Sequence, residues 1–422
     1  GSLIHAHLAR QPTPVCQVNP KIPRSLSDLI DKLLEKNPED RYQSAAGLAA
    51  DLDFLSRAIP ENKTFIPGRR DIRDRFHIPQ RLYGREEELT RLMSAFSEVR
   101  QGASRFLMIK GYSGVGKSSL IREIHQPILL SNGLFIEGKF DQYQRDIPYS
   151  AMVQAFGGLV RRLLTLPGEN LARQREALSS ALFPNAQVII DILPEVEALM
   201  GTQPPVPELG AEESRNRFNR TLLKFMHAVT SEAHPLVLFI DDLQWADPGT
   251  LNMIRLIMAD RESRHFLLIG AYRDNEVGPG HPLMDMLDEA TEAGVMVTGM
   301  TLQPLEPKQI SRLISDTVNR TDEAAGDLSA LIHEKTAGNP FFINQFLKAL
   351  NQEGVFSFNR ERLHWDWSMD DIRSQGITNN VVDLMTRKIS RLPGETGNIL
   401  RAAACIGARF DLDLLASAGG ID

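Results

Sequence analysis

The sequence predicts an α/β protein in which a doubly wound parallel sheet is followed by a smaller helical domain. Three observations predict this fold. Apolar runs typical of buried parallel strands recur between helical or loop segments, at residues 106–109, 134–140, 236–240, 266–271 and 295–297. A glycine-rich loop follows the first run and leads into a helical pattern, and from Pro307 onward helical periodicity replaces the strands. Alternation of strands and helices favours right-handed crossovers and helices on both faces of one sheet.

The composition is that of an ordinary globular protein with several domains. The chain has 422 residues, 42% hydrophobic and 24% charged, and at roughly 150 residues per domain about three domains are expected. The formal net charge of -7 argues against general electrostatic binding to nucleic acid or anionic lipid. Cys16 and Cys405 give no disulfide framework, and no apolar run approaches the roughly 20 residues that cross a bilayer. We therefore expect a cytoplasmic protein with no membrane partner, for which nucleic acid is not an expected ligand.

Residues 1–58 are predicted to form a small helical piece, because apolar residues recur at helical spacing on both sides of a break at Pro38. Residues 59–78 combine prolines and a glycine with many charges and show no sustained period, so they are predicted to be a linker. An amphipathic helix begins near Glu86, and its acidic first turn suits the positive end of a helix dipole.

The strongest chemical signal is the run Gly111-Tyr112-Ser113-Gly114-Val115-Gly116-Lys117-Ser118, which fits the pattern G-x-x-x-x-G-K-[ST] and follows the strand predicted at 106–109. Glycines allow such a loop to point its backbone N–H groups at phosphates, and the helix that begins near Lys117 adds the positive end of its dipole. Lys117 is placed to neutralise β- and γ-phosphate oxygens, and the Ser118 hydroxyl to coordinate Mg²⁺. The predicted nucleotide-binding residues of the loop are Gly111, Ser113, Gly114, Val115, Gly116, Lys117, Ser118 and Ser119.

Two acidic residues, Asp241 and Asp242, come directly after the apolar run 236–240. A phosphate loop needs a second element that holds the metal and the attacking water at the end of a neighbouring strand. We expect Asp241 to hold Mg²⁺ through its water shell and Asp242 to polarise the water. The alternative is that the two carboxylates cap the helix after Asp247, although two acids behind an apolar run are costly without a cation.

Arg273 follows the apolar run 266–271 and could sense or stabilise charge on the γ-phosphate from that strand end. The alternative is that Arg273 forms a salt bridge with Asp274 or Glu276. The predicted catalytic residues are therefore Lys117, Asp242 and Arg273, and the predicted metal ligands are Ser118 and Asp241.

Taken together, these motifs resemble the signal-transduction ATPases with numerous domains (STAND), a branch of the AAA+-like P-loop ATPases. Leu238-Phe239-Ile240-Asp241-Asp242-Leu243-Gln244-Trp245-Ala246-Asp247 is similar to the Walker B region of that branch. Leu82-Tyr83-Gly84-Arg85 is similar to its opening motif, and Gly338-Asn339-Pro340 matches its G-x-P signature. The resemblance implies ATP or ADP with Mg²⁺ as ligands, an adenine pocket lined by Leu82, Tyr83, Gly84 and Arg85, and a nucleotide contact from Pro340. Helix chemistry alone also explains the last motif: Gly338 ends one helix, Asn339 caps the next and Pro340 occupies its first turn.

The resemblance also implies a domain order. A P-loop nucleotide-binding domain is expected at 79–303, a helical lid with a hairpin at 304–375, and the start of a winged-helix domain, cut short, at 376–422. Residues 1–58 resemble the last helices of a serine/threonine protein kinase, through the stretch Glu35-Lys36-Asn37-Pro38-Glu39-Asp40-Arg41-Tyr42. The catalytic motifs of protein kinases are missing from the sequence, so no kinase activity is expected of this chain itself. A kinase tail that runs into a STAND module resembles the large bacterial hybrid sensor proteins.

The implied function is a Mg·ATP-binding signalling switch with slow hydrolysis, which regulates a multidomain bacterial kinase or sensor by nucleotide-dependent domain rearrangement. Other domains of the parent protein are the implied partners, together with nucleotide-dependent self-association. Two alternatives stay open. One is a non-hydrolysing adaptor that holds ADP, and the other is a DNA-binding transcription regulator of the STAND type whose reading helices would lie at 381–392 and 399–406.

Overall fold

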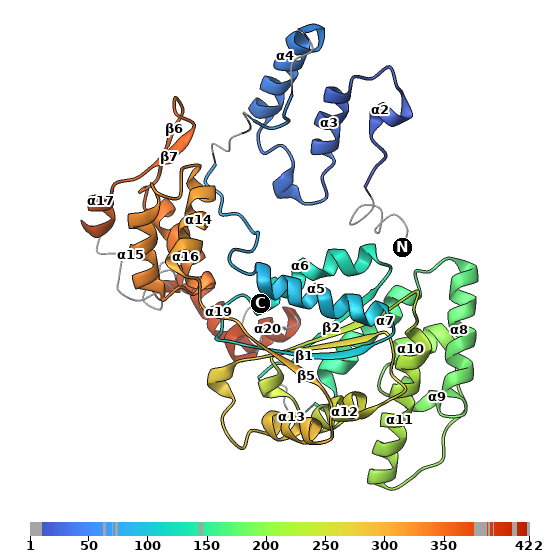
Figure 1. Ribbon diagram of the computed structural model, residues 1–422. Coiled ribbons are helices and arrows are strands. Elements are labelled where there is room, and N and C mark those ends of the chain that lie inside the picture. Colours follow the sequence, from blue (N-terminus) through green and yellow to red (C-terminus); the bar gives the residue numbers. More distant parts are fainter. Residues whose placement is uncertain are drawn as a thin grey trace. The chain divides into compact units, whose positions relative to one another are not determined.

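The protein folds into two compact units, seen in a computed structural model (Figure 1). The structure describes residues 11–61, 65–69, 71, 75–142, 147–374, 386, 389–390, 392–406 and 412–419. The first unit comprises Glu86–Gln303 and Arg391–Asp422 with Gly1, and the second comprises Ser2–Arg85 and Pro304–Ser390. No helix in these described stretches is both long and apolar enough to span a membrane.

A five-stranded sheet forms the centre of the first unit, and its neighbouring strands all pair in parallel in the order β2-β3-β4-β1-β5. The strands are β1 (Ser104–Lys110), β2 (Leu134–Lys139), β3 (Leu236–Asp241), β4 (Phe266–Tyr272) and β5 (Val297–Thr301). β3 and β4 are buried along their whole length, which explains why they appear in the sequence as continuous apolar runs. The predicted α/β fold with a parallel sheet is confirmed.

Two details of the sheet differ from expectation. The last strand begins at Val297 rather than at residue 295 and continues to Thr301. Ala293 and Gly294 form the turn after the preceding helix, and Val295 and Met296 lie between that turn and the strand. The order of strands also places β4 between β1 and β3. The strand that carries the acidic pair is therefore not the direct neighbour of the strand that leads into the glycine-rich loop.

Helices cover both faces of this sheet. α5 (Glu86–Arg100) and α6 (Lys117–Leu130) lie on one face, and α12 (Pro248–Ala259) and α13 (Pro282–Glu292) lie on the other (Figure 1). Five further helices fill the connection between β2 and β3: α7 (Ser150–Leu163), α8 (Gly168–Leu182), α9 (Ala186–Ile190), α10 (Glu195–Met200) and α11 (Ala211–Val229). These helices share one hydrophobic core with the sheet. In this core Phe156 of α7 packs edge to face against Phe225 of α11, with their ring centres 5.8 Å apart.

The first unit also contains α19 (Gly394–Ile406) and α20 (Leu412–Gly419). α19 includes the helix predicted at 399–406. Most of the helix predicted at 381–392, one of the two that the DNA-binding alternative would use, lies outside the described residues.

The second unit combines the N-terminal helices with the helical lid. The N-terminal part contains α2 (Val15–Val18), α3 (Arg24–Leu33), a short 3-10 helix at Pro38–Asp40 and α4 (Ala45–Glu61). The lid contains α14 (Pro307–Val318), α15 (Gly326–Thr336), α16 (Pro340–Gln352) and α17 (Met369–Ser374), and between α16 and α17 it has the antiparallel hairpin of β6 (Ser357–Asn359) and β7 (His364–Asp366). The hairpin predicted between residues 355 and 367 is thus present.

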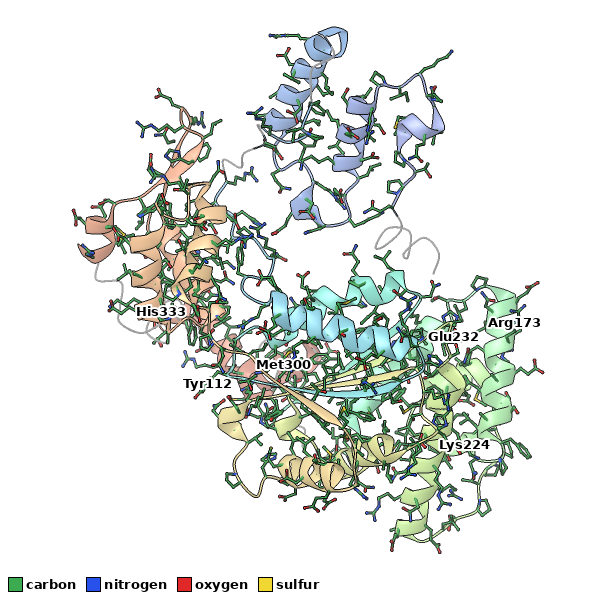
Figure 2. The ribbon with its side chains drawn as sticks, in the orientation of Figure 1. Tyr112, Arg173, Lys224, Glu232, Met300 and His333 are labelled. Carbon is green, nitrogen blue, oxygen red and sulfur yellow. The ribbon has the colours of Figure 1, made fainter. Side chains whose placement is uncertain are left out.

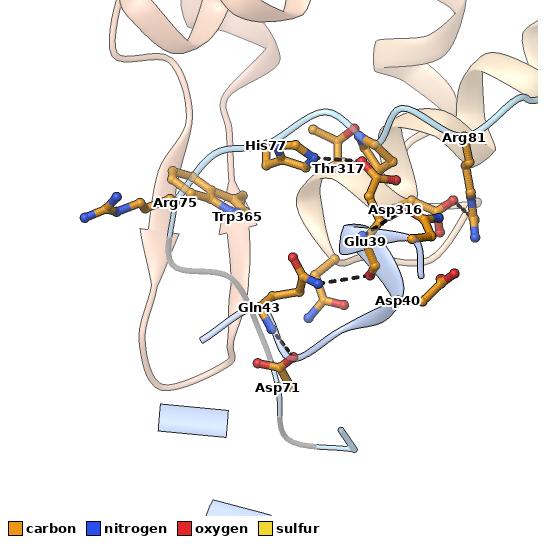
Figure 3. Close-up of a pocket in the computed structure, with 13 residues that line it drawn as sticks. Glu39, Asp40, Gln43, Asp71, Arg75, His77, Arg81, Asp316, Thr317 and Trp365 are labelled. Carbon is orange, nitrogen blue, oxygen red and sulfur yellow. Dashed lines mark hydrogen bonds and ion pairs between the residues drawn. The ribbon is translucent and has the colours of Figure 1, made fainter. Parts of the chain in front are cut away.

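Part of the segment predicted to be a linker is anchored to the N-terminal helices. The carboxylate of Asp71 accepts hydrogen bonds from the backbone N–H groups of Gln43, at 2.5 Å, and Ser44, at 2.9 Å. Further along, the carboxylate of Glu39 accepts from His77 Nε2 at 3.0 Å and from the Gln80 N–H at 2.7 Å. Of these residues, Glu39, Gln43, Asp71 and His77 border a polar cavity of about 250 Å³ within the second unit (Figure 3). Residues 65–80 therefore do not run as a free linker where they are described.

Candidate nucleotide-binding site

The glycine-rich loop connects β1 to α6 through backbone conformations that favour glycine. Gly114 has a φ of 79° and Gly116 a φ of 104°, so both lie in the left-handed region. A Cβ atom at Gly111 would lie 2.8 Å from the carbonyl oxygen of Leu302, which leaves no room for a side chain. Gly116 immediately precedes α6, whose first residue is Lys117. The loop therefore meets the positive end of a helix, as a phosphate site requires.

Lys117 is 8% exposed and its Nζ is directed at the loop itself. It donates to the carbonyl oxygen of Gly111 at 2.5 Å and to that of Tyr112 at 3.1 Å. Tyr112 as a whole residue is 56% exposed, and its contact with Lys117 is through the backbone carbonyl (Figure 2). Burial lowers the pKa of Lys117, and the negative charges of Asp241 and Asp242 oppose that shift. The ammonium group is thus within the electrostatic influence of both acids.

The two residues predicted to hold the metal come together. The Ser118 hydroxyl, in the first turn of α6, donates to Oδ2 of Asp241 at 3.0 Å. Asp241 ends β3 and is 6% exposed, and its Oδ1 accepts from the backbone N–H of Asp242 at 3.0 Å. A hydroxyl and a carboxylate are the hard oxygen ligands that Mg²⁺ prefers.

Asp242 has a φ of 56°, which is uncommon for a residue with a side chain, and it is 4% exposed. Its carboxylate is engaged at both oxygens. Oδ1 accepts from Gln244 Nε2 at 2.9 Å and from Arg273 Nε at 3.2 Å, while Oδ2 lies 3.1 Å from Lys139 Nζ. Neither Asp241 nor Asp242 caps α12, since Asp247 caps that helix by accepting from the Thr250 N–H at 2.9 Å. The capping alternative for the acidic pair is therefore wrong.

Arg273 forms the salt bridge with Glu276 that the sequence offered as an alternative, and its role at a γ-phosphate stays a prediction. It bonds to Asp242 as described, and its guanidinium also forms an ion pair of 2.8 Å with Glu276. The guanidinium carbon lies 4.6 Å from the centre of the Trp245 ring. Arg273 is thus fixed by two carboxylates and one aromatic face at the end of β4, which the sheet order places between β1 and β3.

Three residues of this cluster were not among the predicted site residues: Lys139, Gln244 and Trp245. Lys139 ends β2 and pairs in register with Asp241 of β3. Although its burial alone would lower the pKa of Lys139, Asp241 and Asp242 raise it. In the sequence Lys139 stands within an apolar run that predicts a strand. This position indicates a place in the site only when β2 and β3 are known to be neighbours.

The remaining predicted residues belong to the second unit. Tyr83 is 5% exposed in the core of the lid, and its hydroxyl donates to Asp316 of α14 at 2.8 Å. Gly84 has a φ of 63°, and a Cβ there would collide with the side chain of Gln309. Leu82 and Arg85 flank these two residues, and Arg85 is 6% exposed. The structure therefore places the opening motif in the same unit as the lid.

Pro340 is the first residue of α16. Asn339 caps that helix by accepting from the N–H groups of Phe341 and Phe342, and Gly338 has a φ of 72°. The preceding helix, α15, ends two residues earlier, at Thr336. The helix-capping explanation of the Gly338-Asn339-Pro340 motif is therefore present in the structure, and a contact of Pro340 with nucleotide stays a prediction.

Comparison with known proteins agrees with this geometry. Residues 81–269 match the family model of the AAA ATPase domain. The chain carries an AAA ATPase domain. It has the P-loop AAA+ fold, with the five-stranded parallel sheet and the helical lid described above.

The curated proteins to which the chain is similar include two histidine kinases. The chain is 30% identical to the hybrid signal transduction histidine kinase G of Dictyostelium discoideum over 99% of this chain and 14% of that protein. It is 21% identical to the peroxide stress-activated histidine kinase mak3 of Schizosaccharomyces pombe over 93% of this chain and 20% of that protein. The chain thus spans a seventh to a fifth of the length of these relatives. It is homologous to regions of large hybrid histidine kinases.

Solved structures with a similar fold include two archaeal proteins. The STAND protein with a tetratricopeptide repeat sensor from Pyrococcus horikoshii is 17% identical, with a TM-score of 0.36 over 79% of this chain and 36% of that one. The ORC1 protein of Aeropyrum pernix, solved in complex with DNA, is 13% identical, with a TM-score of 0.39 over 81% of this chain and 78% of that one.

Proposed function

We propose that this chain is a Mg·ATP-dependent switch that hydrolyses ATP slowly and regulates the larger kinase or sensor protein of which it forms a region. The observation that carries the proposal is the cluster at the ends of β1, β3 and β4. It joins the phosphate loop to an acidic pair through the hydrogen bond from Ser118 to Asp241. Such a cluster provides charge stabilisation for a phosphoryl group and a carboxylate to orient water.

The residues fit a bound Mg²⁺ that depends on the nucleotide. Ser118 and Asp241 supply two oxygen ligands, and the described residues contain no group of three or more His, Cys, Asp and Glu side chains that could hold a metal alone. Mg²⁺ usually keeps several waters and shares phosphate oxygens when it binds beside one or two protein ligands. When bound, it would neutralise charge between the β- and γ-phosphates.

Each protein group has a distinct role in this proposal. Lys117 exchanges its two bonds with loop carbonyls for bonds to phosphate oxygens. Asp242 orients and polarises the attacking water. Arg273 follows β4 and stabilises the negative charge that develops on the γ-phosphate. Leu82, Tyr83, Gly84, Arg85 and Pro340 are proposed as contacts on the adenine side.

The regulatory part of the proposal rests on the length of the relatives and on the lid. For nucleotide to switch the domain arrangement almost completely, ATP must favour one arrangement by on the order of 10⁴-fold, about 5.5 kcal/mol. Bonds between a γ-phosphate and Lys117, Arg273 and Mg²⁺ in a site shielded from water could supply much of that difference. The parent protein is proposed to be a hybrid histidine kinase. The relatives come from eukaryotes and give no support to the expected bacterial serine/threonine kinase parent.

The test is nucleotide binding and turnover of Lys117→Ala in the full chain. Loss of the ammonium group should weaken Mg·ATP binding and abolish turnover, because no other side chain of the described loop is placed to neutralise the β- and γ-phosphates. Lys224→Ala is the matched control, since Lys224 is exposed on α11 (Figure 2). Unchanged binding and turnover in Lys117→Ala would overturn the proposed function.

One observation favours a second candidate, the adaptor that holds ADP without hydrolysis. Asp242 accepts bonds from Gln244 and Arg273 and contacts Lys139, so its carboxylate is occupied by protein groups. Turnover of Asp242→Asn at saturating Mg·ATP separates the candidates. A general base contributes roughly 10²- to 10⁴-fold, so a switch that hydrolyses ATP should lose about that factor. An adaptor would show the same background rate before and after the substitution.

A further inference from the structure

Gln244 connects the acid at the end of β3 to the backbone at the end of β4. It lies in a short 3-10 helix, Leu243–Trp245, and is 4% exposed. Its Nε2 donates to Oδ1 of Asp242 at 2.9 Å, and its Oε1 accepts from the Arg273 N–H at 3.1 Å. A carboxylate oxygen can only accept and a backbone N–H can only donate, so the two partners determine which way the amide faces.

The backbone of Gln244 is anchored as well. His281 precedes α13, and its Nδ1 accepts from the Leu283 N–H at 3.1 Å. Nε2 of the neutral ring must then carry the proton, and it donates to the carbonyl oxygen of Gln244 at 3.2 Å. The residue is therefore held at its main chain by α13 and at its side chain by two strand ends.

Among the three side chains described above as contacts of the Asp242 carboxylate, Gln244 is the one without a charge. Lys139 and Arg273 are cations with long side chains, and a γ-phosphate would attract both of them. The amide has no such attraction, and its second bond goes to main chain rather than to a mobile group. It is thus suited to stay on Asp242 when the cations turn to phosphate.

We propose that Gln244 is a positioning residue for ATP hydrolysis: its amide fixes the orientation of the Asp242 carboxylate and makes that orientation depend on the end of β4, which carries Arg273. This inference rests on the proposed function, because Asp242 is assigned there as the group that polarises water. The inference goes beyond that assignment: the side chain of Gln244 holds both Asp242 and the backbone of Arg273, so the two residues move together.

The substitution Gln244→Glu tests the donor end of the amide. Glutamate keeps an oxygen for the Arg273 N–H, but when ionised it places a second carboxylate against Asp242 and has no proton to donate. Two carboxylates that share a site raise the pKa of one of them, so the pair takes up a proton as the pH falls. The introduced side chain, once protonated, can then donate to Asp242 as the amide does.

The charged and titratable groups around this position lie on four strands or helices and in the loops beside them. They are Asp241, Asp242, Lys117, Lys139, Arg273, Asp274, Glu276 and His281. All of them are present in the parent as well, so a change that occurs only in Gln244→Glu belongs to the new carboxylate. Gln244→Met serves as the matched control, because methionine has a similar length and lacks the amide's donor and acceptor at every pH.

The expected result is a rate for Gln244→Glu that is about 10- to 100-fold below the parent at pH 8, the usual loss on removing a supporting hydrogen bond around a reactive group. The rate should rise toward that of the parent as the pH falls toward 6. Gln244→Met should stay low throughout this range. A parent-like rate of Gln244→Glu at pH 8, or a rate that stays as low as that of Gln244→Met at every pH, would overturn the proposal.

A second measurement does not need turnover. Trp245 follows Gln244 and lies under the Arg273 guanidinium, so its fluorescence reports whether the end of β4 is in place. With Trp365→Phe and Trp367→Phe in the background, Trp245 is the remaining tryptophan of the chain. In that background the fluorescence of Gln244→Glu should change with pH. The protein that keeps Gln244 and the Gln244→Met variant should show no such change. A fluorescence of Gln244→Glu that does not change with pH would contradict the inference. If the parent hydrolyses ATP no faster than Lys117→Ala does, the proposed function fails. The fluorescence transition still decides in that case whether Gln244 connects the ends of β3 and β4.

Discussion

Lys139 and Asp242 face each other across two strand ends, with Nζ of the lysine 3.1 Å from Oδ2 of the acid. The same ammonium group lies 3.7 Å from Oδ2 of Asp241. The positive charge of Lys139 therefore partly neutralises both carboxylates. A bound divalent cation would neutralise the same negative charge. Because Lys139 is 55% exposed in its side chain while both acids are buried, the contact is free to open on the solvent side.

We predict that Lys139→Met lowers the stability of the nucleotide-free protein in the presence of a chelator. The two buried carboxylates lose a compensating charge, but the half-exposed lysine is partly screened by water, so a loss of about 1 kcal/mol is expected. Added Mg·ATP should stabilise the variant more than the parent, because its Mg²⁺ meets acids that are less neutralised. Thermal unfolding with chelator and with Mg·ATP measures both effects. Equal melting temperatures of variant and parent with chelator would contradict the prediction, and Lys224→Met is the control.

The ends of the strands could be predicted from the sequence, but the contacts between them could not. Asp241, Asp242 and Arg273 each stand at the end of an apolar run, and parallel strands bring such ends to one edge of a sheet. The order of strands is a tertiary property, and without it neither the place of β4 between β1 and β3 nor the pairing of Lys139 with Asp241 follows. Gln244 stands in the run that resembles the Walker B region, but that resemblance gives no role to the glutamine, and its contacts with Asp242 and Arg273 follow only from the tertiary structure.

The second unit was harder to predict for a related reason. Prolines and charges at 59–78 indicate a linker when only local conformation is considered. The anchoring of Asp71 and Glu39 depends on partners about 30 to 40 residues away. The hydroxyl of Tyr83 likewise bonds to Asp316, more than 200 residues further along the chain, and the adenine-side contact expected of Tyr83 stays a prediction. Contacts at such separations leave no periodic pattern in the sequence.

Asp260 should give the protein a measurable acid dependence. Burial alone would raise the pKa of this carboxyl, but hydrogen bonds from Ser263, from the Glu262 N–H and from His227 hold it below its usual 3.8. A lowered pKa means that the folded state binds its proton less readily than the unfolded chain does. The ionised Asp260 carboxylate therefore contributes its full stabilisation of the folded state above pH 3.8. This contribution is lost as the pH falls through the lower pKa that Asp260 has in the folded state.

We predict that Asp260→Asn is less stable than the parent at pH 7 and that the difference narrows as the pH falls below 3.8. Urea unfolding between pH 3 and pH 7 measures the difference at each pH. Asp288→Asn, an exposed position on α13, should show no such pH dependence. A stability difference between Asp260→Asn and the parent that is constant over the whole range would show that the carboxylate charge has no part in it.

Glu39 should hold the 75–80 segment to the N-terminal helices. Its Oε1 accepts from His77 Nε2 (Figure 3) and from the Gln80 N–H. Glu39→Ala removes both bonds, and at about 1 to 1.5 kcal/mol for one hydrogen bond the Gln80 amide should exchange with solvent roughly tenfold faster. Hydrogen exchange resolved to single amides measures this. Asp40→Ala, in the same 3-10 helix, should leave the Gln80 amide unchanged, and an equal effect of both substitutions would argue against the specific contact.

A comparison of Gly338 with Gly354 distinguishes two reasons why the lid needs glycine: a positive φ and a lack of space for a side chain. Both have a positive φ, 72° and 73°, so alanine at either position should cost about 1 to 2 kcal/mol of backbone strain. At Gly354 nothing lies within 4 Å of an added Cβ, whereas at Gly338 the carbonyl oxygen of Leu305 would collide with it. That oxygen has little freedom to retreat, because the Leu305 N–H donates to the Gly338 carbonyl at 2.7 Å.

Gly338→Ala should therefore destabilise the second unit by at least about 1 kcal/mol more than Gly354→Ala, since it adds a collision with main chain to the same strain. In a Trp245→Phe background the fluorescence of Trp365 and Trp367 reports on the second unit during unfolding by urea. Equal losses in the two variants would mean that the positive φ alone requires glycine in the Gly338-Asn339-Pro340 motif. A larger loss at Gly338 would mean that the motif needs the close approach of two backbone segments, which fixes where α16 begins and hence where Pro340 stands.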